Sequence, residues 1–204
     1  MDLPHDLTLP LRSGQPYWYW LGGRPALDFV NTLRERWWRN VETLVTPGDL
    51  ETWLEEAGLL PSGANARVTR GRLEAARALR EAIDAAVVAV ITDGKAPAAA
   101  VRTIDGWLPA TALTPALDLG PGCAPVLRDR APADVVEHAL GRIALDAAQL
   151  LGTDDRERAR ICASDTCSAR FYDRSPAAGR QWCSMRGCGN VAKARRHRAR
   201  ARGG

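Results

Sequence analysis

Apolar residues recur every three or four positions along most of the first 150 residues, and this spacing places side chains on one face of an α-helix. The longest run, 67–92, carries Leu73, Leu79, Ile83 and Val87 at helical spacing, and Gly94 follows as a stop signal. The same periodicity predicts further helices at 24–37, at 49–57, in a short stretch after Pro97, and at 132–151.

The segments between these helices have a different character. The aromatic run YWYWL at 17–21 favours a short strand. Residues 109–130 are rich in Pro and Gly, with short apolar pieces, and predict a hairpin or an irregular loop. The first 16 residues contain three prolines and little periodicity, which is typical of a loose arm. The pattern therefore predicts a mainly α fold with a few short strands.

Charge divides the chain into two parts. Residues 1–155 carry 15 Lys and Arg against 21 Asp and Glu, whereas residues 156–204 carry 13 against 3, although the whole chain is only +4. With 46% hydrophobic residues the chain can bury a core. We therefore expect a helical domain over 1–153 and a small basic module over 154–204, which combines a β-hairpin with a helix.

The positions of the cysteines support the same division of the chain. Cys162 and Cys167 form one pair with a four-residue spacer, and Cys183 and Cys188 form a second pair with the same spacer. Two such pairs supply the four ligands of a tetrahedral zinc site, and a module this small needs the folding free energy that metal binding provides. The sequence predicts one structural Zn²⁺, with redox cysteines or buried thiols as the alternative. His197 could replace one ligand, and we assign no role to Cys123.

A run of alanine and arginine over 189–202 predicts a helix without an apolar stripe. Its arginines gather on adjacent faces, which suits phosphate contacts and a DNA groove. The helix has no interleaved aromatics, and this favours duplex DNA over single strands. A solvated tail and an acidic protein partner are the alternatives. The candidate nucleic-acid contacts are Arg170, Arg174, Arg180, Arg186, Asn190, Lys193, Arg195, Arg196, Arg198, Arg200 and Arg202.

Two stretches resemble known families. WCSMRGCGNVAKARRHRAR is similar to the end of the CGNR zinc finger, a bacterial module with two cysteine pairs and a basic helix. LGGRPALDFVNTL is similar to the start of the ABATE domain, the helical partner that usually precedes that finger. The resemblance implies a stress-induced transcriptional regulator whose zinc ligands are the four paired cysteines. One departure is Val191, where the name-giving motif of the finger places arginine after Asn190.

The helical domain offers less specific chemistry. Polar residues on one side of the helix expected at 24–37 could line a small pocket for a small-molecule effector: Arg24, Asp28, Asn31 and Thr32. They could equally cap neighbouring backbone or face water. We expect a tight turn at Gly22-Gly23 rather than an anion site. We see no catalytic constellation or cofactor loop, so we expect a regulator rather than an enzyme.

The expected partners follow from these parts. The main hypothesis is a transcription regulator that binds duplex DNA, with the helical domain as effector or dimerisation domain. The alternative is an adaptor whose basic module docks an acidic protein. A homodimer would extend the few base pairs that one small finger reads. The sequence shows no secretory signal and no run long enough for a membrane helix, so we expect a cytoplasmic protein, nucleoid-associated when it binds DNA.

Overall fold

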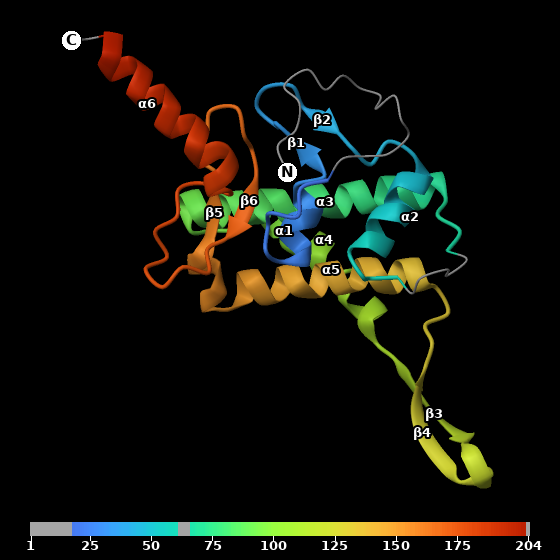
Figure 1. Ribbon diagram of the computed structural model, residues 1–204. Coiled ribbons are helices and arrows are strands. Elements are labelled where there is room, and N and C mark those ends of the chain that lie inside the picture. Colours follow the sequence, from blue (N-terminus) through green and yellow to red (C-terminus); the bar gives the residue numbers. More distant parts are fainter. Residues whose placement is uncertain (1–17, 61–65, 203–204) are drawn as a thin grey trace.

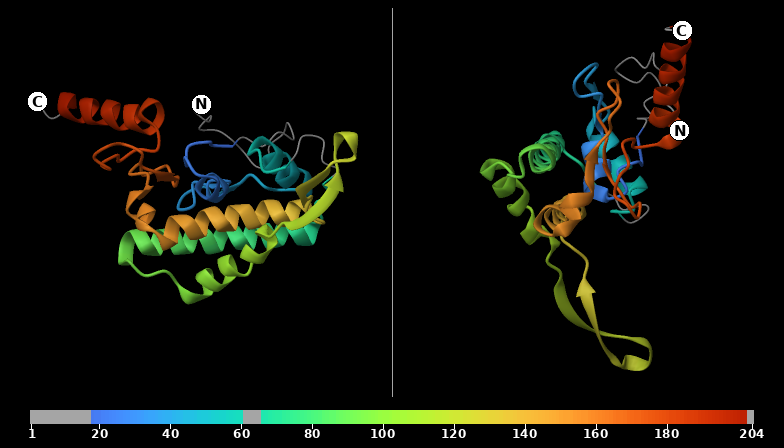
Figure 2. Two further views of the ribbon diagram at one scale, coloured as in Figure 1. Left: turned by 90° about the horizontal axis from the view of Figure 1, so that it is seen from below. Right: turned by 90° about the vertical axis from the view of Figure 1, so that its left-hand side faces the viewer.

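Two long parallel helices form the centre of the molecule (Figures 1 and 2), and Arg72 in the first turn of one binds Asp134 and Glu137 at the start of the other. The computed structural model describes residues 18–60 and 66–202. Helices α3 (Arg70–Asp93) and α5 (Val135–Gly152) lie side by side along their length. Three shorter helices pack around them: α1 (Pro25–Val30), α2 (Pro47–Glu56) and α4 (Ala98–Asp105). This arrangement confirms the mainly helical fold expected from the periodicity.

The helix ends follow local sequence signals. Thr46 caps α2 by accepting from the backbone N–H of Asp49, whose carboxylate in turn accepts from the backbone N–H of Thr46. Thr69 and Asp134 cap α3 and α5 in the same way, through one side-chain oxygen each. Gly94 ends α3 with φ at 70°, a conformation that glycine adopts without strain.

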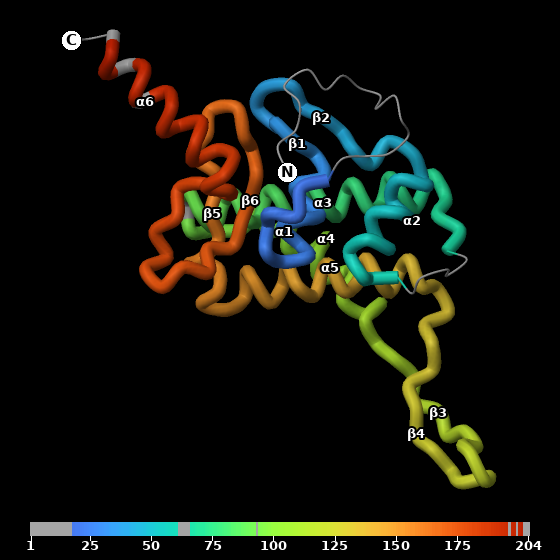
Figure 3. The backbone as a smooth tube through the Cα atoms, viewed as in Figure 1, coloured from blue at the N-terminus to red at the C-terminus, as the bar shows by residue number. Residues whose placement is uncertain are grey.

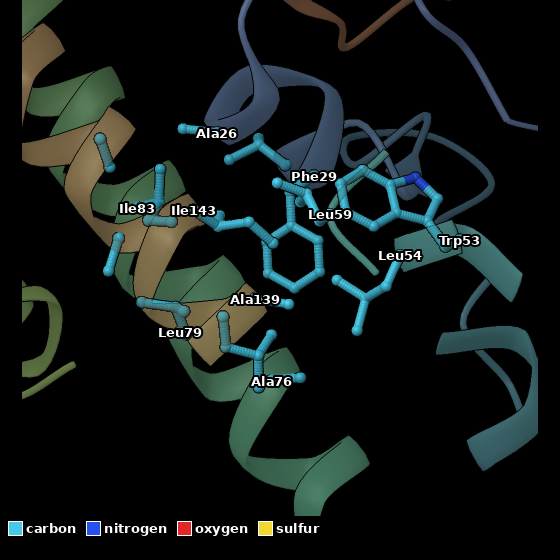
Figure 4. Packing of buried hydrophobic residues seen from close by; sticks show 14 of the residues in the cluster. Ala26, Phe29, Trp53, Leu54, Leu59, Ala76, Leu79, Ile83, Ala139 and Ile143 are labelled. Atoms are coloured by element: carbon cyan, nitrogen blue, oxygen red, sulfur yellow. The ribbon is translucent and has the colours of Figure 1, made fainter. Parts of the chain in front are cut away.

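The apolar faces of α1, α2, α3 and α5 meet in one core (Figure 4). Phe29 from α1 lies near its centre, between Ile143 of α5 and Trp53 of α2, and the Phe29 and Trp53 ring centroids are 5.1 Å apart. Both side chains are fully buried, and burying each large apolar side chain contributes about 1.5–3 kcal/mol. The core holds the helical domain together without help from the cysteines.

Three antiparallel strand pairs accompany the helices. Strands β1 (Leu33–Arg34) and β2 (Val41–Glu42) follow α1, and β5 (Ala159–Ile161) pairs with β6 (Arg170–Tyr172) in the basic module. Strands β3 (Thr114–Leu119) and β4 (Pro125–Arg130) form a hairpin that extends away from the helices (Figure 3). The hairpin expected within 109–130 is therefore present. Short 3₁₀ turns lie at η1 (Leu108–Thr111), η2 (Pro121–Cys123) and η3 (Asp154–Arg158).

The structure corrects the helix expected over 24–37, which ends at Val30. Two polar residues compete with the helical backbone just beyond this point. Thr32 Oγ1 donates to the carbonyl of Phe29, and the side chain of Asn31 binds backbone groups of Arg170. The chain then turns through Glu35 and Asn40, both at positive φ. The apolar residues of the sequence therefore keep helical spacing beyond Val30, although the helix itself ends there.

Two expected strands are also wrong. Residues 18–21 of the aromatic run are irregular, and residue 17 and the proposed arm at 1–16 lie outside the described residues. In the basic module, residues 169–172 and 181–182 are expected as two short strands between the cysteine pairs. Instead, β6 pairs with β5, which precedes the first cysteine, and 181–182 is irregular. The second cysteine pair instead lies on a turn that leads directly into α6 (Asn190–Arg202), with a π-helical turn, η4 (Met185–Gly189), before it. Helix α6 projects away from the body of the molecule (Figures 1 and 2).

Candidate metal centre and basic helix

The four paired cysteines converge at the base of the basic module. The sulfur atoms of Cys162, Cys167, Cys183 and Cys188 all lie within 4.8 Å of one another. The Cys167–Cys183 and Cys183–Cys188 Sγ distances are both 3.8 Å. A tetrahedron with Zn–S bonds of about 2.3 Å has edges of about 3.8 Å, whereas a disulfide needs about 2.05 Å. The cluster therefore has the dimensions of a zinc tetrahedron and excludes disulfide pairing.

Each cysteine pair is held by a tight turn. At the first pair, Cys162 donates its N–H to Ala169, and Cys167 donates to Ser164, at 2.9 and 3.1 Å. At the second pair, the hydroxyl of Ser184 accepts from the N–H of Gly187 at 3.2 Å and caps the turn before α6. In each pair, the four residues between the cysteines form a turn that folds back far enough to point both thiols at one centre.

The thiols form a closed set of ligands. Hydrogen bonds with Cys162, then Cys167 and Cys188, raise the pKa of the Cys183 thiol, because thiolates this close repel one another unless a cation is present. Zn²⁺ would supply that positive charge and hold all four as thiolates. Four sulfur ligands leave no position for a water molecule, so the site is structural and not catalytic. Among the described residues, His197 does not join this cluster, and Cys123 is exposed and distant from it in sequence.

Helix α6 begins directly after the metal centre and carries six of the 13 basic residues of 156–204. Lys193, Arg198 and Arg200 are exposed, and no acidic side chain among the described residues pairs with them. Arg195 is also exposed but forms an ion pair with Asp165 at 2.6 Å. The side chains of Arg196 and Arg202 lie outside the described set. Arg186, just before the helix, and Asn190, its first residue, are exposed, and the Asn190 side-chain amide donates to the Arg186 carbonyl.

Three arginines of the module are engaged in contacts within the protein. Arg170 is only 3% exposed, and its Nε lies 2.9 Å from Asp84 of α3. The interpretation of Arg170 as a nucleic-acid contact is therefore wrong, because its guanidinium is buried against the helical domain. Arg180 donates to the carbonyls of Trp182 and Cys183. Arg174 is exposed and donates to the carbonyl of Gly23.

Two of the four residues expected to line an effector pocket, Arg24 and Asn31, instead join the helical domain to the module. The Asn31 side chain donates to the carbonyl of Arg170 at 2.9 Å and accepts from its N–H at 2.8 Å. Arg24 binds Asp146 of α5 and also Asp155, which accepts in turn from the Tyr172 hydroxyl. These contacts agree with the backbone-capping alternative.

The four candidates also do not meet in one cavity. Arg24 and Asp28 line one small pocket, Asn31 lines a different one, and Thr32 lines neither. Thr32 is buried, donates to Phe29 and accepts from Arg80. Gly22 and Gly23 form a tight turn as expected. Gly22 has to be glycine, because a Cβ at this position would meet the backbone N of Asp28 at 2.6 Å.

Asp84 is a residue that sequence reasoning missed. It holds the buried guanidinium of Arg170 and also lies 3.3 Å from Arg36. The signal was present in the sequence, since Glu81 and Asp84 are acidic residues one turn apart on an otherwise largely apolar helix. Only the tertiary arrangement shows that this acidic edge faces the basic module.

Asp28 gives a pH-dependent prediction. Burial raises its pKa to about 6, although it accepts from the Gly22 N–H at 2.7 Å. Because the carboxyl group holds its proton more tightly in the folded protein than in the unfolded chain, protonation stabilises the fold. This contribution to the unfolding free energy is fully present below the ordinary pKa near 4, and it is lost as pH rises through 6. An Asp28→Asn variant keeps the acceptor oxygen without the charge. We expect its unfolding free energy to rise relative to the native chain by up to about 1.4 kcal/mol per pH unit between pH 4 and 6, and then to level off.

Urea unfolding of both proteins at half-unit pH steps measures this difference. Zinc loss at low pH affects both proteins and cancels when they are compared. A difference that stays constant across the range would contradict the assignment of Asp28 as the titrating group.

Comparison with known families agrees with this architecture. Residues 23–154 match the ABATE family, described as "putative stress-induced transcription regulator", and residues 158–201 match the CGNR zinc finger. Both are of regulator or zinc-finger type and not families of enzymes. None of the curated proteins matches the chain. Within the described residues, the helices are too short or too polar to cross a membrane. Together with the geometry, the finger match establishes four cysteines placed to bind one zinc ion.

Proposed function

We propose that this chain, which belongs to the ABATE family and ends in a CGNR zinc finger, is a bacterial transcription regulator that binds duplex DNA. In this proposal residues 154–204 contact the DNA, and residues 1–153 act as the effector or dimerisation domain. The protein would work in the cytoplasm, where thiols stay reduced and available to zinc, and would join the nucleoid when it binds DNA.

One observation carries the proposal: α6 presents a row of exposed cations with little competition from acidic side chains. Lys193, Arg198 and Arg200 have no acidic partner within the described residues. The 13 residues of α6 span about 20 Å, and the major groove admits a helix. Because the second cysteine pair lies at the start of α6, zinc would fix the direction in which the helix projects.

The zinc-loaded protein, incubated with a pool of random DNA duplexes at moderate salt, tests this function. Sequencing of the bound fraction is expected to yield an enriched motif. A protein that binds no duplex, but retains an acidic protein partner after nuclease treatment, would instead establish the adaptor function.

The β3–β4 hairpin supports a dimer. Leu117 pairs with Leu127 across the hairpin, and Leu119 pairs with Pro125 on the same face. The three leucines are 72–74% exposed, although an isolated two-stranded hairpin is marginally stable in water. The four charged residues of the hairpin balance to zero, so two copies can meet without net repulsion: Asp118, Arg128, Asp129 and Arg130. We propose that this apolar face packs against the same face of a second copy.

Replacing both Leu117 and Leu127 by glutamate is expected to convert the dimer into a monomer, because four carboxylates would meet at the two-fold interface. Sedimentation velocity measures the change, and far-UV circular dichroism is expected to stay the same. Thr114→Glu with Arg130→Glu is the matched control, since these residues pair on the opposite face. A native chain that sediments as a monomer would contradict the dimer and leave DNA binding to be judged by the duplex selection.

A further inference from the structure

A pocket of about 180 Å³ lies between the helical domain and the metal centre. Residues 19–39 form one wall, and residues 164–191, with three of the four zinc ligands, form the other. Its volume is below the roughly 300–1,000 Å³ of drug-sized sites, so any ligand is small. This is the pocket that Asn31 borders, and the expected effector residues Arg24, Asp28 and Thr32 are not among its lining residues.

The pocket contains a buried arginine with unused donors. The side chain of Arg34 is 1% exposed, and its Nε and Nη1 have no hydrogen-bond partner among residues 18–60 and 66–202. Its remaining nitrogen, Nη2, donates to the Tyr19 hydroxyl at 3.0 Å, and the guanidinium lies 4.1 Å from the centre of the Tyr19 ring. Burying a guanidinium with unpaired N–H groups costs folding free energy. A ligand that accepts hydrogen bonds from these groups would remove that cost.

The neighbouring acidic residue, Glu35, does not accept from the free N–H groups of Arg34. Glu35 lies 3.6 Å from Arg34, but its two oxygens accept from Arg39 at 2.5 and 2.8 Å. Burial lowers the pKa of Arg34, in keeping with a cation whose donors are not all met. A ligand that carries a negative charge would accept from these free donors.

The remaining walls decide which kind of anion fits. Leu21, Leu33, Trp38 and Val191 contribute apolar surface to the pocket. A zinc ion with four thiolates carries a charge of −2 and borders the same space, so every additional negative charge on a ligand adds to the repulsion. These features favour a singly charged head with an apolar body over inorganic phosphate.

We propose that this pocket binds a small organic carboxylate, with the carboxylate on Arg34 and the apolar body between Leu33, Trp38 and Val191. Charge-assisted hydrogen bonds to a carboxylate would satisfy the free donors of the guanidinium.

The position of the pocket connects this ligand to the basic helix, and this step rests on the proposed function. Val191 belongs to the first turn of α6, and Cys188 is a zinc ligand, whereas Arg34 belongs to β1. A ligand that contacts both the helical domain and the start of α6 binds best when these two parts are in one particular position relative to each other. It would therefore change DNA affinity, and DNA would change ligand affinity by the same factor.

Isothermal titration of the zinc-loaded protein with sodium benzoate tests the site, and benzamide serves as the neutral ligand of the same shape. We expect one benzoate per chain and at least 10-fold weaker binding of benzamide, because hydrogen bonds to charged groups contribute about 1.5–3 kcal/mol. Equal affinities, or no benzoate binding, would overturn the proposal. Competition by inorganic phosphate as strong as that of benzoate would overturn the organic ligand class.

An Arg34→Met variant separates ligand binding from a structural role. Removing a buried, uncompensated charge is often neutral or stabilising, so its thermal midpoint is expected to stay level or rise while benzoate affinity falls at least 10-fold. Arg102→Gln, an exposed arginine outside the pocket, is the matched control and keeps full binding. Retained benzoate affinity in Arg34→Met overturns the proposal. A variant that does not fold assigns Arg34 a structural role and overturns it as well.

DNA affinity measured with and without benzoate tests the connection separately. A change in the native protein that is absent in Arg34→Met supports a ligand-controlled regulator. Benzoate binding without any effect on DNA affinity overturns only the connection. Benzoate binding by a protein that binds no DNA overturns the proposed function and leaves the pocket in place.

Discussion

A Cys183→Ser variant is expected to lose its zinc ion and to unfold the C-terminal module while the helical core persists. Cys183 is 4% exposed, and its sulfur lies 3.8 Å from two of the other ligands. Serine does not supply a thiolate, so the tetrahedral set is broken. Structural zinc contributes on the order of 10 kcal/mol or more to folding in zinc-finger peptides, which exceeds what this small module gains from its own apolar contacts.

The separate core explains why the damage stays local. Apart from the cysteines, the buried apolar residues of the described cluster around the metal centre are Ala169 and Phe171, whereas α1, α2, α3 and α5 share a much larger cluster. The helical domain does lose contacts, including the Asn31 bonds to Arg170 and the bond from the Tyr172 N–H to the Gly22 carbonyl. We expect lower stability of the helical domain and not its unfolding.

Metal analysis and amide hydrogen exchange measure the two halves of this prediction. Zinc content is expected to fall from one ion per chain to none. Amides of β6 lose protection, whereas those of α3 near Ile83 keep it. Cys123→Ser is the matched control, because Cys123 is exposed and outside the cluster. A Cys183→Ser protein that keeps one zinc ion and protected β6 amides would contradict the assignment of the metal centre.

The sequence predicted those features that depend on local spacing. Periodic apolar residues located α2, α3, α4 and α5 to within a few residues, because each helix buries one face in the common core. The cysteine spacing predicted the metal site, since two tight turns are enough to bring four thiols together. Pro, Gly and short apolar pieces were enough to expect a hairpin or an irregular loop within 109–130, and a hairpin is present.

Features that depend on contacts between distant segments were not predicted. Asn31 ends α1 by binding the backbone of Arg170, 139 residues away, and no local pattern carries that information. Arg170 looked like part of a basic surface because charge alone does not show that Asp84 lies opposite it. The pocket at Arg34 was missed for the same reason, since its two walls come from opposite ends of the chain.

Replacing Lys193, Arg198 and Arg200 together by alanine is expected to weaken duplex binding and flatten its dependence on salt. Each phosphate contact that is lost removes about 0.9 from the slope of log affinity against log salt concentration, so three contacts remove up to about 2.7. From 50 to 200 mM salt, the native protein should therefore lose up to about 40-fold more affinity than the variant. Arg195 is left in place because Asp165 already neutralises part of its charge.

Fluorescence anisotropy titrations at four salt concentrations give both slopes. The matched control replaces Arg67, Lys95 and Arg102 by alanine, three exposed cations of the helical domain, so the net charge of the two variants is the same. Equal slopes in the two variants would show that net charge, and not the placement of cations on α6, governs binding. A steeper loss with the α6 variant places the phosphates along this helix. Zinc would then act on DNA binding indirectly, because it fixes the turn from which α6 projects.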